Sequence, residues 1–254
     1  VQQITWGGIV MTSSNPALQR MFAPGSITET ASGSMTVRGT VNKIGILLIC
    51  VAATAFLVWE MELSYAVPAA ILGAIGGFIV ALVTIFKASW ARYTAPVYAL
   101  LEGLFLGGLS RYFNDLVPGL PPLALIFTFC ILGVMAIVYR AGIIKATQKF
   151  KMAVIGATFG IAVAYGAILV FRLFGMESIA LSDMGFIGIG IGLFIVVVAA
   201  LNLVIDFDMI EQGVAQGAPA HMEWFGAFGI LLTLVWLYVE VIRLAWTIAT
   251  ILDS

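Results

Sequence analysis

Five polar side chains stand out in a sequence dominated by apolar residues. Asn202, Asp206, Asp208 and Glu211 fall within ten positions at the end of one apolar run, and Glu240 lies inside the next run. An acid in a membrane segment is costly, so each one is by default a candidate functional residue. The question is whether these acids act together or only mark where a helix leaves the membrane.

Paired carboxylates in a membrane have a chemistry that single ones lack. Two carboxylates held close together in a low dielectric cannot both ionise cheaply, so they share one proton. Loss of that proton makes them repel each other, which can open a helix bundle. The deprotonated oxygens also suit a hard cation such as calcium. Proton-sensitive gating and calcium passage therefore need the same residue types.

The acids near the helix end and in the third apolar run also have simpler interpretations. Asp206 can be a helix-end acid exposed to water, and Asp208 and Glu211 are expected to be solvated residues that close the helix. Glu102, in the run ALLEGLFLGG, is either a buried glutamate bonded to a neighbouring helix or an acid that lines a pore.

Glu240 has a rival interpretation of its own. If its helix ends near Ile242, Glu240 and Arg243 form an ordinary i, i+3 pair at the far membrane interface. The sequence nevertheless stays apolar from Leu244 to Leu252, and this favours a position for Glu240 inside the bundle.

Composition excludes a water-soluble protein. Of the 254 residues, 62% are hydrophobic and 10% are charged, whereas soluble domains carry about 25% charged residues. The net charge of −1 gives no electrostatic basis for a nucleic-acid partner. A single histidine, His221, excludes a multi-histidine metal site, and no HExxH, GxSxG or P-loop motif occurs. We therefore expect neither an enzyme nor a cofactor.

Seven apolar segments approach the length of about 20 residues that a helix needs to cross a bilayer. They cover residues 44–59, 66–86, 93–109, 123–139, 152–174, 185–210 and 224–252. The sequence predicts an all-α polytopic membrane bundle over 43–254, preceded by a flexible cytoplasmic tail over 1–42 that is rich in Ser, Thr, Gly and Pro. The ten residues before Met11 lack the pattern of a signal peptide, and their origin stays open.

Basic residues predict the orientation of the seven helices. With the N-terminus inside, nine Lys and Arg residues fall on the cytoplasmic side, and only Arg111, Arg172 and Arg243 fall elsewhere. This favours N-in and C-out, which makes the hairpin after Glu211 an acidic patch on a basic face. Glycines four residues apart predict tight helix packing, with a glycine-lined pore as the minor alternative. These pairs are Gly73/Gly77, Gly103/Gly107, Gly156/Gly160 and Gly188/Gly192.

Several runs resemble the Bax inhibitor-1-like family, also called transmembrane Bax-inhibitor-motif proteins. The carrying runs are VIDFDMI (204–210), LYVEVIRL (237–244) and the seven-helix plan. Four more, MTVRGTVNKIG (35–45), ALLEGLFLGG (99–108), YRAGIIKATQKF (139–150) and GAPAHMEWFGAFG (217–229), are similar to a bacterial branch of the family. The resemblance covers the chain from Ser14 onward. It implies six helices around a central seventh, in the cell's inner membrane, and a pH-sensitive calcium leak gated by an acid pair.

The resemblance also implies roles for particular residues. Asp206 and Glu240 match the acid pair, which would sense pH and bind calcium transiently, and Lys87 matches a basic residue that can bond to the pair. Here the second acid is Glu where the family usually has Asp, and the base is Lys where it usually has Arg. Glu102 and Asn202 are the candidate pore-lining partners.

The spacing of the acid pair sets a geometric condition. Asp206 and Glu240 are 34 positions apart. With straight helices of about 1.5 Å per residue on both sides of a turn at 217–219, their depths differ by about 15 Å. They meet only if the connection folds back or the last helix starts well outside the membrane. Otherwise Glu240 faces Asn202 or Glu102.

Two further functions stay open beside the calcium leak. One is a non-conducting interaction protein that binds or restrains other membrane proteins, such as quality-control proteases, through its acidic hairpin and glycine-rich faces. The other is a proton-coupled carrier of a small solute. All three functions imply contact with the lipid bilayer. The channel and the carrier also imply calcium ions or protons as partners.

Overall fold

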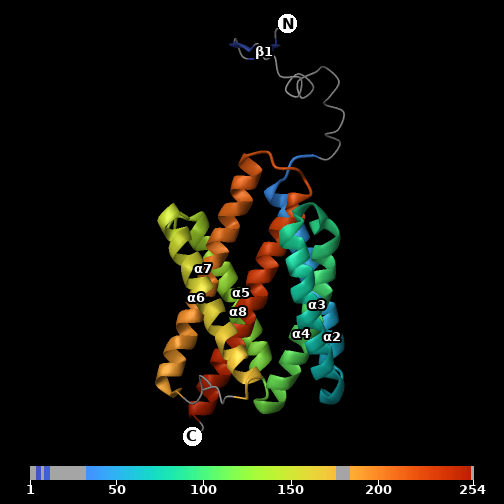
Figure 1. Ribbon diagram of the computed structural model, residues 1–254, viewed down its shortest axis with the longest axis vertical. Helices are drawn as coiled ribbons and strands as arrows, with labels where there is room; N and C mark the ends of the chain where they lie inside the picture. Colours follow the sequence, from blue (N-terminus) through green and yellow to red (C-terminus); the bar gives the residue numbers. More distant parts are fainter. Residues whose placement is uncertain (1–3, 7–8, 12–32, 176–183, 253–254) are drawn as a thin grey trace.

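The computed structural model is a bundle of long helices and describes residues 4–6, 9–11, 33–175 and 184–252 (Figure 1). The long helices are α2 (Val37–Trp59), α3 (Leu63–Phe86), α4 (Ala91–Leu116), α5 (Leu120–Arg140), α6 (Gln148–Leu173), α7 (Phe186–Ala215) and α8 (Met222–Leu252), with a 3-10 turn, η2 (Ala88–Trp90), between α3 and α4. Ahead of them, β1 (Ile4–Trp6) and β2 (Ile9–Met11) pair antiparallel. Residues 1–3, 7–8 and 12–32, which make up most of the expected tail, lie outside the described residues.

Six of these helices are long and apolar enough to cross a membrane: α2, α3, α5, α6, α7 and α8. The chain is therefore an all-helical, multi-span membrane protein in contact with lipid. The helix α4, over the expected span 93–109, is equally long but carries Arg92, Glu102, Arg111 and Asp115. Length and apolarity alone therefore do not establish a seventh span.

Capping residues set two of the helix starts. The Thr36 side chain accepts a hydrogen bond from the Gly39 amide, and α2 begins at Val37, inside the expected tail. The Thr147 side chain accepts a bond from the Phe150 amide in the same way at the start of α6. Such caps satisfy amide groups that have no partner within the helix. The helices therefore extend beyond the apolar runs that reveal them in the sequence.

The last helix, α8, is the most buried of the six apolar helices. It packs against α2, α4, α5 and α7, while α3 packs on α4 and α6 packs on α7 in outer positions (Figure 1). Residues on every side of α8 are buried, among them Leu231, Leu237 and Ile242. A buried polar side chain on α8 must therefore find its partner inside the bundle.

Glycines bring α4 into close contact with its neighbours. A Cβ added at Gly73, Gly103 or Gly107 would lie 2.5 Å from a carbonyl oxygen of an adjacent helix. The predicted tight packing is thus confirmed for α2, α3 and α4. It is wrong for Gly156 and Gly160 of α6, because nothing lies within 4 Å of a Cβ added there.

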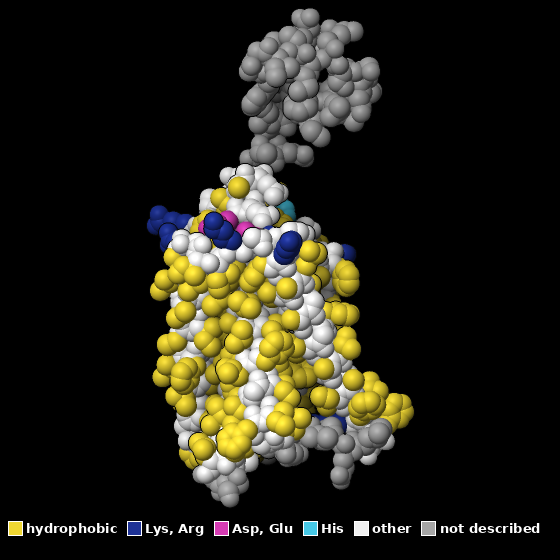
Figure 2. All heavy atoms as spheres, turned by 90° about the vertical axis from the view of Figure 1, so that its left-hand side faces the viewer, with side chains coloured by type: hydrophobic (Ala, Val, Ile, Leu, Met, Phe, Trp, Pro, Cys, Tyr) yellow, Lys and Arg dark blue, Asp and Glu magenta, His cyan; other side chains and the backbone are white. Residues whose placement is uncertain are grey.

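Charge gathers at the end of the bundle from which the tail leaves, above a wide apolar belt (Figure 2). The basic residues of the helix ends and loops on this side are Arg38, Lys43, Lys87, Arg92, Arg140, Lys145, Lys149 and Lys151. The connection between α7 and α8 lies at the same end (Figure 1). The acidic hairpin and the basic face therefore meet, as the sequence predicts.

Candidate functional site

Asp206 lies in the interface between α7 and α8. The Thr233 hydroxyl of α8 donates a hydrogen bond to Asp206 Oδ2 at 2.6 Å, and Thr233 is buried. One turn earlier on α8 is Gly229, where an added Cβ would be 3.9 Å from Asp206 Oδ1. Across the described residues, no basic side chain forms an ion pair with Asp206. This carboxylate therefore faces the buried helix without a counter-charge.

Glu240 lies at a different site, where a basic side chain balances its charge. Its side chain is 2% exposed and accepts hydrogen bonds from the Tyr165 hydroxyl at 3.0 and 3.1 Å and from Trp236 Nε1 at 3.1 Å. Arg243 Nη2 lies 2.9 Å from Glu240 Oε2 and also bonds to Tyr165. Each interpretation of Glu240 is correct in one respect. Glu240 and Arg243 form the i, i+3 pair, but the pair lies inside a helix that continues to Leu252 and not at its end.

The two members of the predicted acid pair do not meet. Asp206 lies beside Thr233, and Glu240 is seven residues further along α8, about 10 Å at 1.5 Å per residue. This agrees in direction with the depth difference expected from the spacing. Calcium ligands lie within about 2.3–2.6 Å of the ion, so one calcium ion cannot bind both carboxylates in this conformation. Among the described residues, no three Asp, Glu, His or Cys side chains form a metal site.

The candidate pore-lining residues face other helices. Glu102 is buried against α3, where a Cβ added at Gly77 would lie 2.5 Å from Glu102 Oε1. The Asn202 amide donates to Thr158 Oγ1 of α6 at 2.8 Å and to the Val198 carbonyl at 2.9 Å. Neither faces Glu240, so the alternative pairings expected from the spacing are wrong for this conformation.

The predicted basic latch is also elsewhere. Lys87 caps the end of α3, and its ammonium lies 4.3 Å from the centre of the Trp90 ring in η2. Its side chain is exposed. This cation–π contact stabilises the ammonium at the surface. Lys87 therefore bonds to neither Asp206 nor Glu240 in this conformation.

Asp208 and Glu211 bind neighbouring helices. Asp208 forms an ion pair with Lys151 of α6, and the Tyr139 hydroxyl of α5 donates to Glu211 Oε2 at 2.7 Å. The expectation of a merely solvated helix-end residue is wrong for Asp208, whose side chain is 19% exposed in its ion pair. Glu211 is exposed, as expected, and in addition accepts a bond from α5. Together they fasten the end of α7 to α5 and α6.

Sequence reasoning missed Glu223, in the first turn of α8. It is 6% exposed, pairs with Lys43, and accepts bonds from the Thr36 amide at 2.8 Å and the Thr36 hydroxyl at 2.9 Å. A Cβ at Gly39 would collide with its carboxylate. Glycine inside a helix costs about 1 kcal/mol relative to alanine, so Gly39 was the available signal of a close approach.

A family model described as Bax inhibitor 1 like matches residues 15–250, which is nearly the whole chain. No curated protein matches the chain.

Proposed function

The chain belongs to the Bax inhibitor 1 like family, and from that premise we propose that it is a calcium leak channel of the cell's inner membrane whose conduction depends on pH. We further propose that α4 crosses the membrane with the other six long helices, N-terminus inside and C-terminus outside. The glycine contacts that enclose α4 between α2 and α3 support a buried span that tolerates charge. The excess of Lys and Arg at the tail end supports the orientation.

Asp206 is the observation that carries this proposal. Its hydrogen-bond partner is the neutral Thr233, whereas Glu240 is balanced by Arg243. A carboxylate in a membrane without a counter-charge either carries a proton or attracts a cation. If a cation replaces the proton on Asp206, cation passage depends on pH.

The proposed gating requires a movement of α8. In the arrangement described above, Glu240 is held by Tyr165, Trp236 and Arg243 and cannot share a proton with Asp206. We therefore treat this arrangement as the closed state and Asp206 as the first residue to exchange its proton. Glu240 joins the sensor only after its own contacts break.

Flux measurements on the purified chain in liposomes test this function. Calcium entry, followed with an enclosed fluorescent indicator, should change between about pH 6 and pH 8, where buried carboxylates exchange protons. Asp206→Asn should abolish this pH dependence. Asp208→Asn, two residues away and paired with Lys151, is the matched control and should retain it. If Asp206→Asn leaves flux and its pH dependence intact, the sensor assignment is wrong.

A non-conducting interaction protein is the second candidate, and the outer surface of α6 offers a place where a partner helix could bind. This helix packs mainly on α7 and leaves large apolar residues such as Phe159, 70% exposed, on its outer surface. Such a surface suits either lipid or a partner helix. Under this alternative the purified chain conducts nothing at any pH, and one fixed membrane protein is recovered with it.

A further inference from the structure

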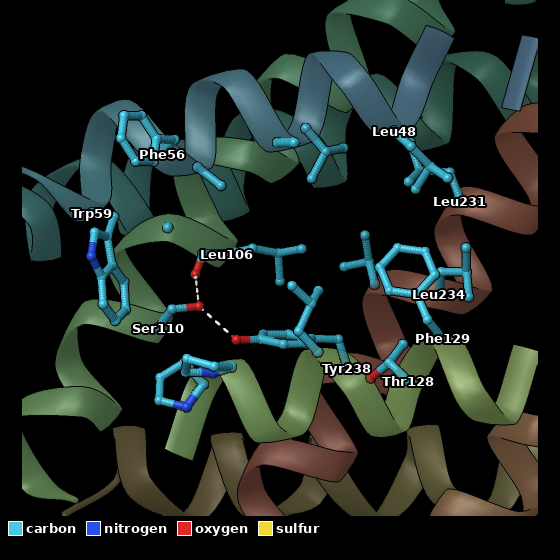
Figure 3. Close-up of a pocket in the computed structure, with 18 residues that line it drawn as sticks. Leu48, Phe56, Trp59, Leu106, Ser110, Thr128, Phe129, Leu231, Leu234 and Tyr238 are labelled. Carbon is cyan, nitrogen blue, oxygen red and sulfur yellow. Dashed lines mark hydrogen bonds between the residues drawn. The ribbon is translucent and has the colours of Figure 1, made fainter. Parts of the chain in front are cut away.

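A deep apolar groove lies between α2 and α5, apart from the acids described above (Figure 3). Its volume is about 420 Å³, within the range of roughly 300–1,000 Å³ that is common for small-molecule sites. Residues of α2 and α5 form its walls, and residues of α4 and α8 form its floor. The channel proposal makes no use of this groove.

The mouth of the groove faces the bilayer. Phe56 on the α2 wall is 64% exposed, and Leu125 and Phe129 on the α5 wall are 49% and 43% exposed. The floor is buried, with Leu231 2% and Tyr238 5% exposed. Because α2 and α5 are both apolar spans, the mouth between them opens into hydrocarbon. An occupant must therefore come from the membrane.

The three hydroxyl side chains that line the groove use their hydrogen-bond donors within the protein, and the remaining donor of the lining, Trp59 Nε1, belongs to the end of the groove next to Glu60. Ser110 Oγ donates to the Leu106 carbonyl at 2.6 Å and is 2.7 Å from the Tyr238 hydroxyl. Since the Ser110 proton is already used, Tyr238 is the donor in that second bond. Thr128 donates to the Ala124 carbonyl at 2.8 Å. These three hydroxyls leave no donor for a ligand, so the groove suits a hydrocarbon.

The length of the groove matches one leaflet. Along α2 it runs from Leu48 to Trp59. These positions are eleven residue steps apart, or about 16 Å along the helix, against about 15 Å for half of a hydrocarbon core. Trp59 is the last residue of α2, next to Glu60, and tryptophan is enriched at membrane surfaces. Leu48 and Leu231 lie together at the opposite end (Figure 3). The groove thus extends from the membrane surface to near the midplane.

We propose that this groove binds one acyl chain of a phospholipid from the leaflet on the side of the α2–α3 turn. The head group lies near Trp59, and the chain extends over α8 toward Leu231. Bulk lipid contacts only the outer helices, whereas this one chain reaches the buried helix of the bundle. The inference does not depend on calcium conduction.

A photoreactive phospholipid tests this directly. The full chain is reconstituted in liposomes that contain a phospholipid with a diazirine in the middle of one acyl chain, illuminated, and mapped by mass spectrometry. We expect insertion at Leu231 or Leu234, which are 2% and 5% exposed and line the floor of the groove. Phe159 of α6, 70% exposed, reports the labelling by bulk lipid.

Filling variants supply the control. Ala52 lines the groove at an exposed position, and the neighbouring Ala53 is exposed but does not line it. Ala52→Trp should lower floor labelling at least about tenfold, which corresponds to about 1.4 kcal/mol, whereas Ala53→Trp should not change it. Leu125→Trp fills the groove from the other wall and should act like Ala52→Trp. Phe159 labelling should stay constant in all three variants, which shows that bulk lipid labels each of them equally. An unchanged equilibrium unfolding curve shows that each one is folded.

Three results would overturn the proposal. The first is labelling of Phe159 without labelling of the floor. The second is floor labelling that neither Ala52→Trp nor Leu125→Trp reduces. The third is cross-linking of a second copy of the chain through groove residues, which would identify another protein chain as the occupant.

Discussion

Replacement of Arg243 by methionine should strongly destabilise the bundle. Arg243 is the cation beside Glu240, whose side chain is 2% exposed, with 2.9 Å between Nη2 and Oε2. Methionine retains much of the side-chain length and suits apolar surroundings. The substitution therefore removes a charge and its donors with little loss of packing, and it leaves Glu240 without a counter-charge.

The exposure of the two partners sets the magnitude. Removal of one partner from a fully buried ion pair costs about 3–5 kcal/mol. The Arg243 side chain is 31% exposed, so water screens part of the interaction, and we expect about 2–3 kcal/mol. Tyr165 and Trp236 continue to donate to Glu240 and limit the loss.

The assay is equilibrium unfolding in mixed micelles of a mild detergent and dodecyl sulfate, followed by circular dichroism. Glu240→Gln combined with Arg243→Met should recover about 1–2 kcal/mol as a coupling energy. Arg111→Met is the control, because the Arg111–Asp115 pair spans 3.4 Å with side chains 33% and 38% exposed and should contribute less than about 1 kcal/mol. If Arg243→Met costs no more than Arg111→Met, the argument that α8 holds an ionised glutamate is refuted.

Three other substitutions test separate contacts. Gly39→Ala should lower the free energy of unfolding by about 1–3 kcal/mol, because its Cβ collides with Glu223; an unchanged unfolding curve would contradict that approach. Gly107→Val should cost as much or more, since even a Cβ there is 2.5 Å from a carbonyl oxygen of α2, and a thermal melt in detergent measures it. Thr233→Val keeps the shape of the side chain but removes the hydrogen-bond donor to Asp206. The pH at which calcium flux is half-maximal should therefore move upward by about one pH unit, and an unchanged value would show that Asp206 does not set the pH response.

Apolarity along the chain predicted the helices because it is a local property. Every expected apolar run lies within a helix or overlaps one, and the errors concern helix starts such as Val37, which a threonine cap determines. Local composition likewise singled out Asp206 as a costly acid. Its partner Thr233 could not be predicted, because the rotation of each helix about its axis depends on packing between distant segments. Tyr165, which reaches Glu240 from α6, was hidden for the same reason.

The position of α8 has a consequence for how this protein is made. A ribosome synthesises the chain from its N-terminus, so the helix that contacts α2, α4, α5 and α7 emerges last. Until then, the surfaces that it will cover, including Ser110 and Asp206, have no partner from α8. The hydrogen bonds between Thr36 and Glu223 join the start of α2 to the first turn of α8. Assembly of the bundle therefore waits for the end of translation, and a chain that stops before Met222 has no complete core.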